Sequence, residues 1–222
     1  ILKRLGINNV AVVPEQENPD GNFPTAPYPN PEIRQAFECA LKVAESYNPD
    51  ILLATDPDSD RVGIAVNEKG EYKLFSGNDV GALLLNYVLE RRTANGTLPK
   101  NPIAVKTIVS TELCQKIAEN YGCELKNVLT GFKFIGEKIK EMDEGGDEHF
   151  IFGFEESIGF LGGTYARDKD AVFAAMMMAE VGCWYKAKGM SVYDGLLSLY
   201  DKYGYFIENT ESTVFGGFDS AE

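Results

Sequence analysis

The sequence is poor in the residues that build zinc sites and disulfide frameworks. Its 222 residues include a single histidine, His149, and four cysteines, none of which has C-x-x-C spacing. Structural zinc centres need four cysteine or histidine ligands at short, regular spacings. We therefore expect Cys39, Cys114, Cys123 and Cys183 to be reduced thiols in a cytoplasmic protein.

The sequence also lacks a basic surplus and a long apolar run. Lys and Arg number 21 against 34 Asp and Glu, which leaves a net charge of −13. Such acidity disfavours a nucleic acid or an anionic membrane as partner. The most apolar stretch, residues 171–185, contains Glu180 and indicates a buried helix instead of a membrane span. No signal-peptide pattern is evident. Because the chain opens at Ile1 in the middle of a pattern, we expect it to be a piece of a longer protein.

What the sequence does contain is an alternation of short β-like runs and helical patterns, typical of an α/β fold. Its 44% hydrophobic and 25% charged residues suit globular domains with real cores. The alternation predicts two consecutive α/β units, with a domain boundary near residue 74.

The periodicities place the individual elements. We expect strands at residues 10–13, 51–54, 61–66, 72–75, 103–109, 124–129, 150–152 and 205–215. We expect helices at residues 79–92, 111–121, 132–142, 170–186 and 191–203, and another that Asn30 caps with Pro31 at its first position.

The most informative segment is Thr55-Asp56-Pro57-Asp58-Ser59-Asp60-Arg61, which follows an apolar strand. Three carboxylates at alternate positions of a loop can converge on one point, where a divalent cation such as Mg²⁺ would neutralise them. Arg61 adds a donor fork suited to phosphate. An EF-hand calcium loop fits poorly, since Arg61 and Asn67 stand where Gly and Glu are needed. A plain turn and an aspartyl nucleophile at Asp56 remain open.

A second polar cluster, Gly153-Phe154-Glu155-Glu156-Ser157-Ile158-Gly159, also follows a buried strand. Carboxylates, a hydroxyl and flanking glycines suit the neighbouring hydroxyls of a sugar, although a polar turn would have the same composition. Arg167-Asp168-Lys169-Asp170 places cations at a helix start, where they oppose the helix dipole, so a bound anion would account for them. Lys106 and Thr130-Gly131-Phe132-Lys133 are further candidates at strand ends.

Together these segments resemble the α-D-phosphohexomutase superfamily, in particular its phosphoglucomutase and phosphomannomutase branch. The similarity rests on four ordered motifs, with support from residues 15–24 and 29–32. The motifs are Asp56-Pro57-Asp58-Ser59-Asp60-Arg61, Thr130-Gly131-Phe132-Lys133-Phe134, Gly153-Phe154-Glu155-Glu156-Ser157 and Arg167-Asp168-Lys169-Asp170. The resemblance implies a four-domain protein around a central cleft. This chain would cover most of domain 2 (residues 1–73), all of domain 3 (residues 74–205) and the start of the connection to domain 4 (residues 206–222). Each of its two α/β domains would be a mixed, mostly parallel sheet flanked by helices.

The resemblance also implies roles for particular residues. Asp56, Asp58 and Asp60 would bind Mg²⁺ together with a phosphoserine. Glu155 and Ser157 would bind sugar hydroxyls, while Thr130, Gly131 and Lys169 would lie near the substrate. Arg61 and Lys106 would assist proton transfer. No segment resembling T-A-S-H-N-P or R-x-S-G-T-E-P occurs in the sequence, so we expect the chain alone to be inactive.

The implied function is interconversion of hexose 1-phosphate and hexose 6-phosphate by a phosphoserine enzyme, through a bisphosphorylated sugar. Its partners would be glucose or mannose phosphate and the missing domains 1 and 4. Preference among glucose, mannose and pentose phosphates stays open. Two alternatives also remain: a non-catalytic module that binds metal and sugar phosphate, and a phosphatase that uses Asp56 as its nucleophile.

Overall fold

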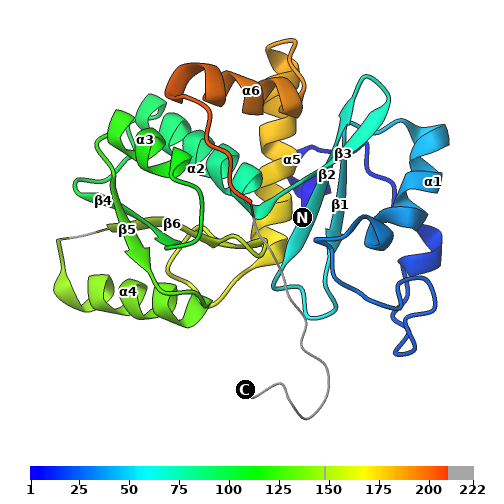
Figure 1. Cartoon of the computed structure of the whole chain (residues 1–222), viewed down its shortest axis with the longest axis horizontal. Helices are drawn as coiled ribbons and strands as arrows, with labels where there is room; N and C mark the ends of the chain where they lie inside the picture. Colours follow the sequence, from blue (N-terminus) through cyan, green and yellow to red (C-terminus); the bar gives the residue numbers. More distant parts are fainter. Residues whose placement is uncertain (148, 210–222) are drawn as a thin grey trace.

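The computed structural model describes residues 1–147 and 149–209, which form two α/β units side by side (Figure 1). A three-stranded sheet organises the first unit and a four-stranded sheet the second. Helix α5 (Ala171–Ala187) stands between them and packs against strands of both. The predicted α/β fold class is therefore confirmed.

The first sheet has the order β1 (Ile51–Thr55), β2 (Val62–Glu68) and β3 (Glu71–Phe75). The 3₁₀ helix η3 (Arg34–Phe37) and helix α1 (Glu38–Tyr47) cover one face, where Phe37 packs against Leu52 and Ala65. Val62, Ile64 and Val66 point to the other face, toward α5 and α6 (Val192–Tyr203). Side chains alternate between the faces of a strand, so the apolar pattern of β2 serves two cores.

Strand direction in this sheet differs from the prediction, because every pair is antiparallel. Short connections leave no alternative. Residues 56–61 join β1 to β2, and Lys69-Gly70 turns β2 into β3 with positive φ at both residues. Parallel neighbours would need a crossover of a dozen or more residues, whereas a two-residue turn of this kind makes an antiparallel hairpin.

Two predictions for the first unit were wrong. Residues 10–13 form no strand; Val10 and Val12 are exposed, and the adjacent elements are the short 3₁₀ helices η1 (Leu2–Leu5) and η2 (Pro14–Gln16). Asn30 does not cap a helix that begins at Pro31. Its side chain accepts a hydrogen bond from the Glu32 backbone at 3.0 Å in a local turn, and α1 begins only at Glu38.

The second sheet has the order β5-β4-β6-β7 and is mixed and mostly parallel, as predicted. Its strands are β4 (Pro102–Thr107), β5 (Glu124–Val128), β6 (His149–Glu155) and β7 (Gly159–Leu161). Helix α4 (Phe132–Gly145) covers one face, whereas α2 (Gly77–Ala94) and α3 (Leu113–Asn120) lie across the other (Figure 1). Helix α6 (Val192–Tyr203) packs on α5 and α2.

The predicted helices of the second unit all form, with shifts of a few residues at their ends. Capping boxes at Ser76 with Asp79 and at Ser191 with Asp194 begin α2 and α6. The strand predicted at 205–215 does not occur over residues 205–209, and its remainder lies outside the described residues. None of the helices within the described ranges combines the length and apolarity that a membrane crossing requires.

Candidate functional site

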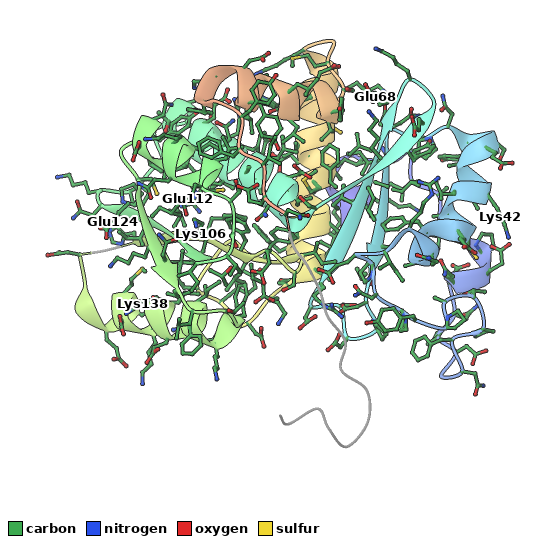
Figure 2. The ribbon with its side chains drawn as sticks, viewed as in Figure 1. Lys42, Glu68, Lys106, Glu112, Glu124 and Lys138 are labelled. Carbon is green, nitrogen blue, oxygen red and sulfur yellow. The ribbon has the colours of Figure 1, made fainter. Side chains whose placement is uncertain are left out.

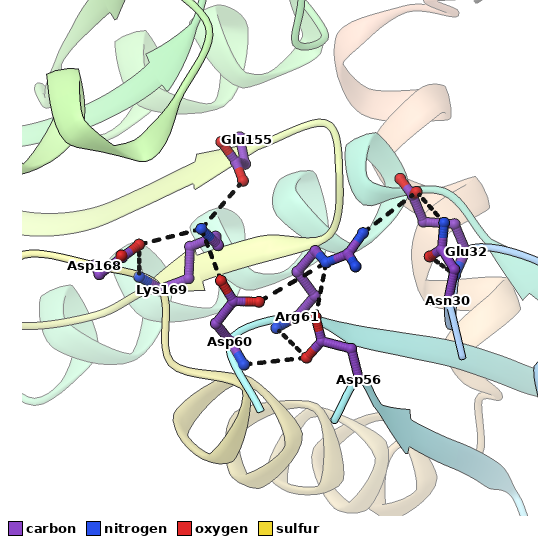
Figure 3. A network of polar contacts seen from close by, with 8 residues as sticks. All are labelled: Asn30, Glu32, Asp56, Asp60, Arg61, Glu155, Asp168 and Lys169. Atoms are coloured by element: carbon purple, nitrogen blue, oxygen red, sulfur yellow. Dashed lines mark hydrogen bonds and ion pairs between the residues drawn. The ribbon is translucent and has the colours of Figure 1, made fainter. Parts of the chain in front are cut away.

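The loop after β1 folds around the carboxylate of Asp56. This side chain is buried, and its Oδ1 accepts hydrogen bonds from the backbone N–H groups of Asp60 at 3.2 Å and Arg61 at 3.1 Å. Arg61 Nε donates to its Oδ2 at 2.8 Å (Figure 3). Ser59 takes a positive φ of 58°, which turns the chain back on itself. The loop is thus held from within by its first carboxylate.

The three aspartates predicted as metal ligands lie together. One carboxylate oxygen from each of Asp56, Asp58 and Asp60 lies within 4.8 Å of the others, and Asp58 is exposed. Mg²⁺ binds oxygen at about 2.0–2.1 Å in octahedral geometry, so two oxygens on one ion are roughly 3.0 Å apart when adjacent and roughly 4.2 Å apart when opposite. Inward movement of the side chains would bring the three oxygens to these distances, and a donor set made of carboxylates fits a hard divalent cation.

Lys169 connects this loop to the second unit. Its Nζ lies 2.9 Å from Asp60 Oδ2 and 3.9 Å from Glu155 Oε1 (Figure 3). It also contacts Asp168 at 3.2 Å, and the Phe132 ring lies 5.6 Å away. Lys169 therefore lies between Asp60 of the acidic loop and Glu155, the carboxylate predicted to bind sugar.

Backbone contacts fasten the two loops to each other. Arg61 and Gly159 form an isolated antiparallel bridge, and Val62 N–H donates to the Ile158 carbonyl at 3.2 Å. Ala171 N–H, at the start of α5, donates to Ser59 O at 3.1 Å. A Cβ at Gly159 would lie 2.2 Å from Lys169 Cδ, so only glycine leaves room for the lysine to pass.

Burial and partners shift the pKa values of these carboxyl groups in different directions. Burial raises the pKa of Glu155, and the nearby Lys169 and Ser157 offset this only in part. Burial also raises the pKa of Asp60, against the opposing pull of Lys169. Burial alone would raise the pKa of Asp56 too, but the hydrogen bonds from Arg61 hold it below its usual value. Asp56 is thus the most firmly ionised of the three.

Lys106 lies outside this network, in a separate one at the end of β4. Its side chain is fully buried, and Nζ contacts Ser110 O at 2.9 Å, Glu112 Oε1 at 2.9 Å and Thr107 O at 3.4 Å. Lys106 and Glu112 lie side by side in the second unit (Figure 2). In this arrangement Lys106 does not face the acidic loop.

The other predicted substrate residues surround the same junction. Thr130 is exposed, and Gly131 is the residue before α4 with a φ of 112°. The first residue of that helix, Phe132, brings it to Lys169. Ser157 is half-buried beside Glu155. The structure therefore brings the acidic loop, Lys169 and the Glu155–Ser157 segment to the junction of the two units. Thr130 and Gly131 directly precede the helix that approaches Lys169 through Phe132, and Lys106 lies apart.

Sequence reasoning missed several polar residues of this region. Glu32, which lies 3.8 Å from the Arg61 guanidinium, belongs to a segment that supports the family resemblance, but it was not predicted as a site residue. The hydroxyl groups of Thr107 and Ser110 were also missed, although they follow directly after Lys106 at a strand end. That position, where a buried strand meets a helix, could have marked them.

A cavity of about 1190 Å³ lies beside the first sheet, but it does not coincide with this junction. Its walls include the segment near Val10 and Val12, α1, β1 and the edge of the acidic loop at Asp56. Glu155, Ser157 and Lys169 are not among its walls. The charged groups, and not this cavity, therefore define the candidate site.

Most of the chain matches two domains of one protein family. Residues 1–70 match phosphoglucomutase/phosphomannomutase, alpha/beta/alpha domain II, and residues 76–203 match alpha/beta/alpha domain III of the same family. A phosphomannomutase of Mycoplasmoides pirum is 37% identical over 215 residues, 96% of this chain and 38% of that protein. A phosphoglucomutase of Staphylococcus aureus (strain USA300) is 36% identical over 220 residues, 99% of this chain and 39% of that protein. The chain thus spans about two fifths of the length of these relatives.

Solved structures share the fold. The phosphoglucomutase parafusin of Paramecium, in its open form, superposes with a TM-score of 0.55 at 22% identity, over 71% of this chain and 25% of that chain. The N-acetylphosphoglucosamine mutase of Aspergillus fumigatus, in complex with GlcNAc-6P and magnesium, gives 0.51 at 12% identity, over 72% of this chain and 36% of that chain. The resemblance to phosphoglucomutases and phosphomannomutases inferred from the motifs is confirmed: the chain belongs to the phosphoglucomutase/phosphomannomutase family.

Proposed function

We propose that this chain is the central part of a Mg²⁺-dependent mutase that interconverts hexose 1-phosphate and hexose 6-phosphate. The observation that carries the proposal is the position of Lys169, 2.9 Å from the metal-competent Asp60 and 3.9 Å from Glu155. Residues 1–73 would belong to domain 2, residues 74–205 to domain 3, and residues 206–222 to the connection to domain 4. The names of the relatives support the same activity.

The metal would be held by Asp56, Asp58 and Asp60, with a phosphoserine from domain 1 as a further ligand. The magnesium in the Aspergillus structure supports this choice of ion. A bound Mg²⁺ would offset negative charge on the phosphoryl group that is transferred. Arg61 holds Asp56 through Nε, and its side chain is partly exposed. We therefore propose that Arg61 orients a phosphoryl oxygen and assists proton transfer.

The sugar would be bound at the loop between β6 and β7. Glu155 offers carboxylate oxygens to two neighbouring hydroxyl groups, and Ser157 can both donate and accept. Lys169 would hold the substrate's negative charge, and the exposed Thr130 with the open backbone at Gly131 would contact the sugar ring. Glucose and mannose phosphates both present hydroxyl groups that suit these donors and acceptors.

Lys106 is the candidate that needs the largest change to act. Its three N–H groups all face oxygens of its own loop, so assistance to proton transfer requires the loop of residues 107–112 to open.

The phosphatase alternative finds no support in the geometry of Asp56. Both of its oxygens accept hydrogen bonds, which lowers their reactivity as nucleophiles. The four free cysteines support the proposed cytoplasmic location.

The test is an assay of the full-length protein that contains this chain, with glucose 1-phosphate and mannose 1-phosphate as substrates. We expect Mg²⁺-dependent formation of the 6-phosphate and loss of activity with a chelator. The chain of 222 residues alone, purified free of host enzyme, should convert neither substrate, because it lacks a phosphoryl donor. Failure of the full-length protein to convert any hexose phosphate would contradict the proposal.

A further inference from the structure

A second polar network lies directly behind the sugar-binding loop, and the proposed chemistry does not use it. Thr107, the last residue of β4, is fully buried, and its Oγ1 lies 2.7 Å from Glu156 Oε2. The buried Ser110 brings its Oγ to 2.6 Å from the same Thr107 oxygen. A hydroxyl is therefore enclosed between a carboxylate and a second hydroxyl, with no water needed to satisfy it.

The protons of this network can be assigned. A threonine hydroxyl has one proton, and a carboxylate only accepts, so Thr107 donates to Glu156 and Ser110 donates to Thr107. Lys106 Nζ in turn donates to the Ser110 carbonyl at 2.9 Å and holds the backbone of that residue in place. The chain of donors runs in one direction, from the end of β4 to the carboxylate of Glu156.

Glu156 is well placed to control the sugar loop. It lies between Glu155 and Ser157, the two residues assigned to the sugar hydroxyls. Its carbonyl oxygen lies against the start of α2, where a Cβ at Gly77 would come within 2.0 Å of it. The side chain is thus tied to β4 and the backbone abuts α2, so both fix the short segment that carries the two sugar-binding groups.

The same turn has a backbone conformation that needs such support. Ile158 has a φ of 56°, which is a rare conformation for a β-branched residue. Backbone of this kind persists only where its surroundings over-determine it. The Val62 N–H bond to Ile158 O supports the turn from the first unit, and the Thr107 hydroxyl supports it from the second.

We infer that Thr107 and Glu156 are positioning residues for sugar binding: the hydroxyl of Thr107 holds Glu156 and thereby fixes the segment that carries Glu155 and Ser157. The kinetic consequence of this inference rests on the proposed function. The geometric consequence, a turn stabilised by one buried hydroxyl, does not.

The kinetic test compares Thr107→Val, which removes the hydroxyl at nearly constant volume, with Thr107→Ser, which keeps it. In the full-length enzyme, Thr107→Val should raise KM for hexose phosphate about 10-fold while kcat stays within about threefold, since a hydrogen bond to a charged group is lost. Thr107→Ser should remain within about twofold of the original KM. If Thr107→Val does not fold, Glu156→Leu removes the other partner at a half-buried position and should give the same KM change.

Tyr87→Phe is the matched control. It deletes a hydroxyl that donates to a carboxylate, Glu180 Oε1 at 2.8 Å, between α2 and α5 and away from the sugar loop. This variant should leave KM unchanged even where it lowers thermal stability. An unchanged KM in Thr107→Val, or an equal rise in Tyr87→Phe, would overturn the inference.

Hydrogen exchange of the full-length protein without substrate separates this inference from the proposed function. Thr107→Val should speed amide exchange in residues 155–159 about 10-fold, whereas Tyr87→Phe should not. A protein that shows this change but converts no hexose phosphate would refute the mutase assignment and leave the positioning geometry intact. Unchanged exchange in residues 155–159 would refute the positioning role whatever the activity.

Discussion

The loop after β1 and the loop after β4 both place charged side chains at the end of a strand, but they leave those charges in opposite states. In the acidic loop Asp58 is exposed, and oxygens of the three aspartates lie within 4.8 Å of one another. In the β4 loop Lys106 is fully buried and each of its N–H groups faces a protein oxygen. The acidic loop therefore keeps carboxylate oxygens available for a cation, whereas Lys106 in the β4 loop has no N–H group available for a ligand.

This difference suggests that the acidic loop binds a ligand and that the β4 loop stabilises the structure around it. Like charges held close together cost free energy unless a ligand joins them, so the acidic loop is understandable as a site. A buried cation whose donors are all satisfied fixes the structure around it. Lys106 matches a position to which the family resemblance assigns proton transfer, yet its contacts are those of an anchor for the loop that carries Thr107 and Ser110.

Among the substitutions proposed for the two loops, Asp58→Asn should reduce activity most. We expect turnover of the full-length enzyme at limiting Mg²⁺ to fall 100- to 1000-fold, about 3–4 kcal/mol in activation free energy. Stability should change by less than about 0.5 kcal/mol, because the side chain is exposed. Steady-state kinetics and thermal unfolding measure the two quantities, with the exposed Asp201→Asn on α6 as control. Near-normal turnover would show that the triad does not hold the metal.

Lys106→Met tests whether the buried lysine stabilises the loop after β4. Methionine fills much of the same volume but leaves the Ser110 carbonyl without its donor, so we expect a loss of about 2 kcal/mol in unfolding free energy. Glu112 is largely exposed and can be solvated, which limits the cost. Urea unfolding measures the loss. A large fall in kcat without any loss of stability would instead assign Lys106 to proton transfer.

Glu155→Gln should change the unfolding free energy by less than Lys106→Met does, and should increase it. Burial raises the pKa of Glu155 above its ordinary value of 4.5, so its ionised form destabilises the folded state at neutral pH. The neutral amide should increase unfolding free energy by about 1 kcal/mol at pH 7 while it weakens sugar binding.

The pH dependence of this gain checks its cause. Below the unfolded pKa the carboxyl is protonated in both states, so the difference between Glu155→Gln and the original chain should vanish there. The difference should develop as the pH rises through the folded pKa. Urea unfolding between pH 4 and 7 would reveal it. A loss of stability that does not vary with pH would show that the hydrogen bonds of Glu155 outweigh its desolvation.

The second unit was predictable from sequence to within a few residues, because its helices have clear apolar faces and capping residues. Phe132, Ile135, Ile139 and Met142 all pack on one side of α4 as their spacing indicates. The first unit was less predictable. Val10 and Val12 have the β propensity of a strand, but a strand also needs a hydrogen-bonded partner, and propensity cannot provide one. Asn30 has the same signature in a local turn as in a helix cap.

The site was predictable in its parts and not in its assembly. Alternate aspartates after an apolar run were sufficient to indicate a metal loop, and the structure brings them together. The approach of Lys169 to Asp60 and Glu155 depends on how α5 and the β6–β7 turn pack against the first sheet. The pairing of Thr107 with Glu156, 49 residues apart, depends likewise on packing that no local pattern encodes.

Crystals of the full-length protein soaked in Mn²⁺, which takes the same oxygen ligands as Mg²⁺ and scatters anomalously, would show directly whether the three aspartates bind a divalent cation. We predict an anomalous peak about 2.1 Å from oxygens of Asp56, Asp58 and Asp60, and its loss in Asp58→Asn. A peak elsewhere, or none at these three carboxylates at millimolar Mn²⁺, would contradict it.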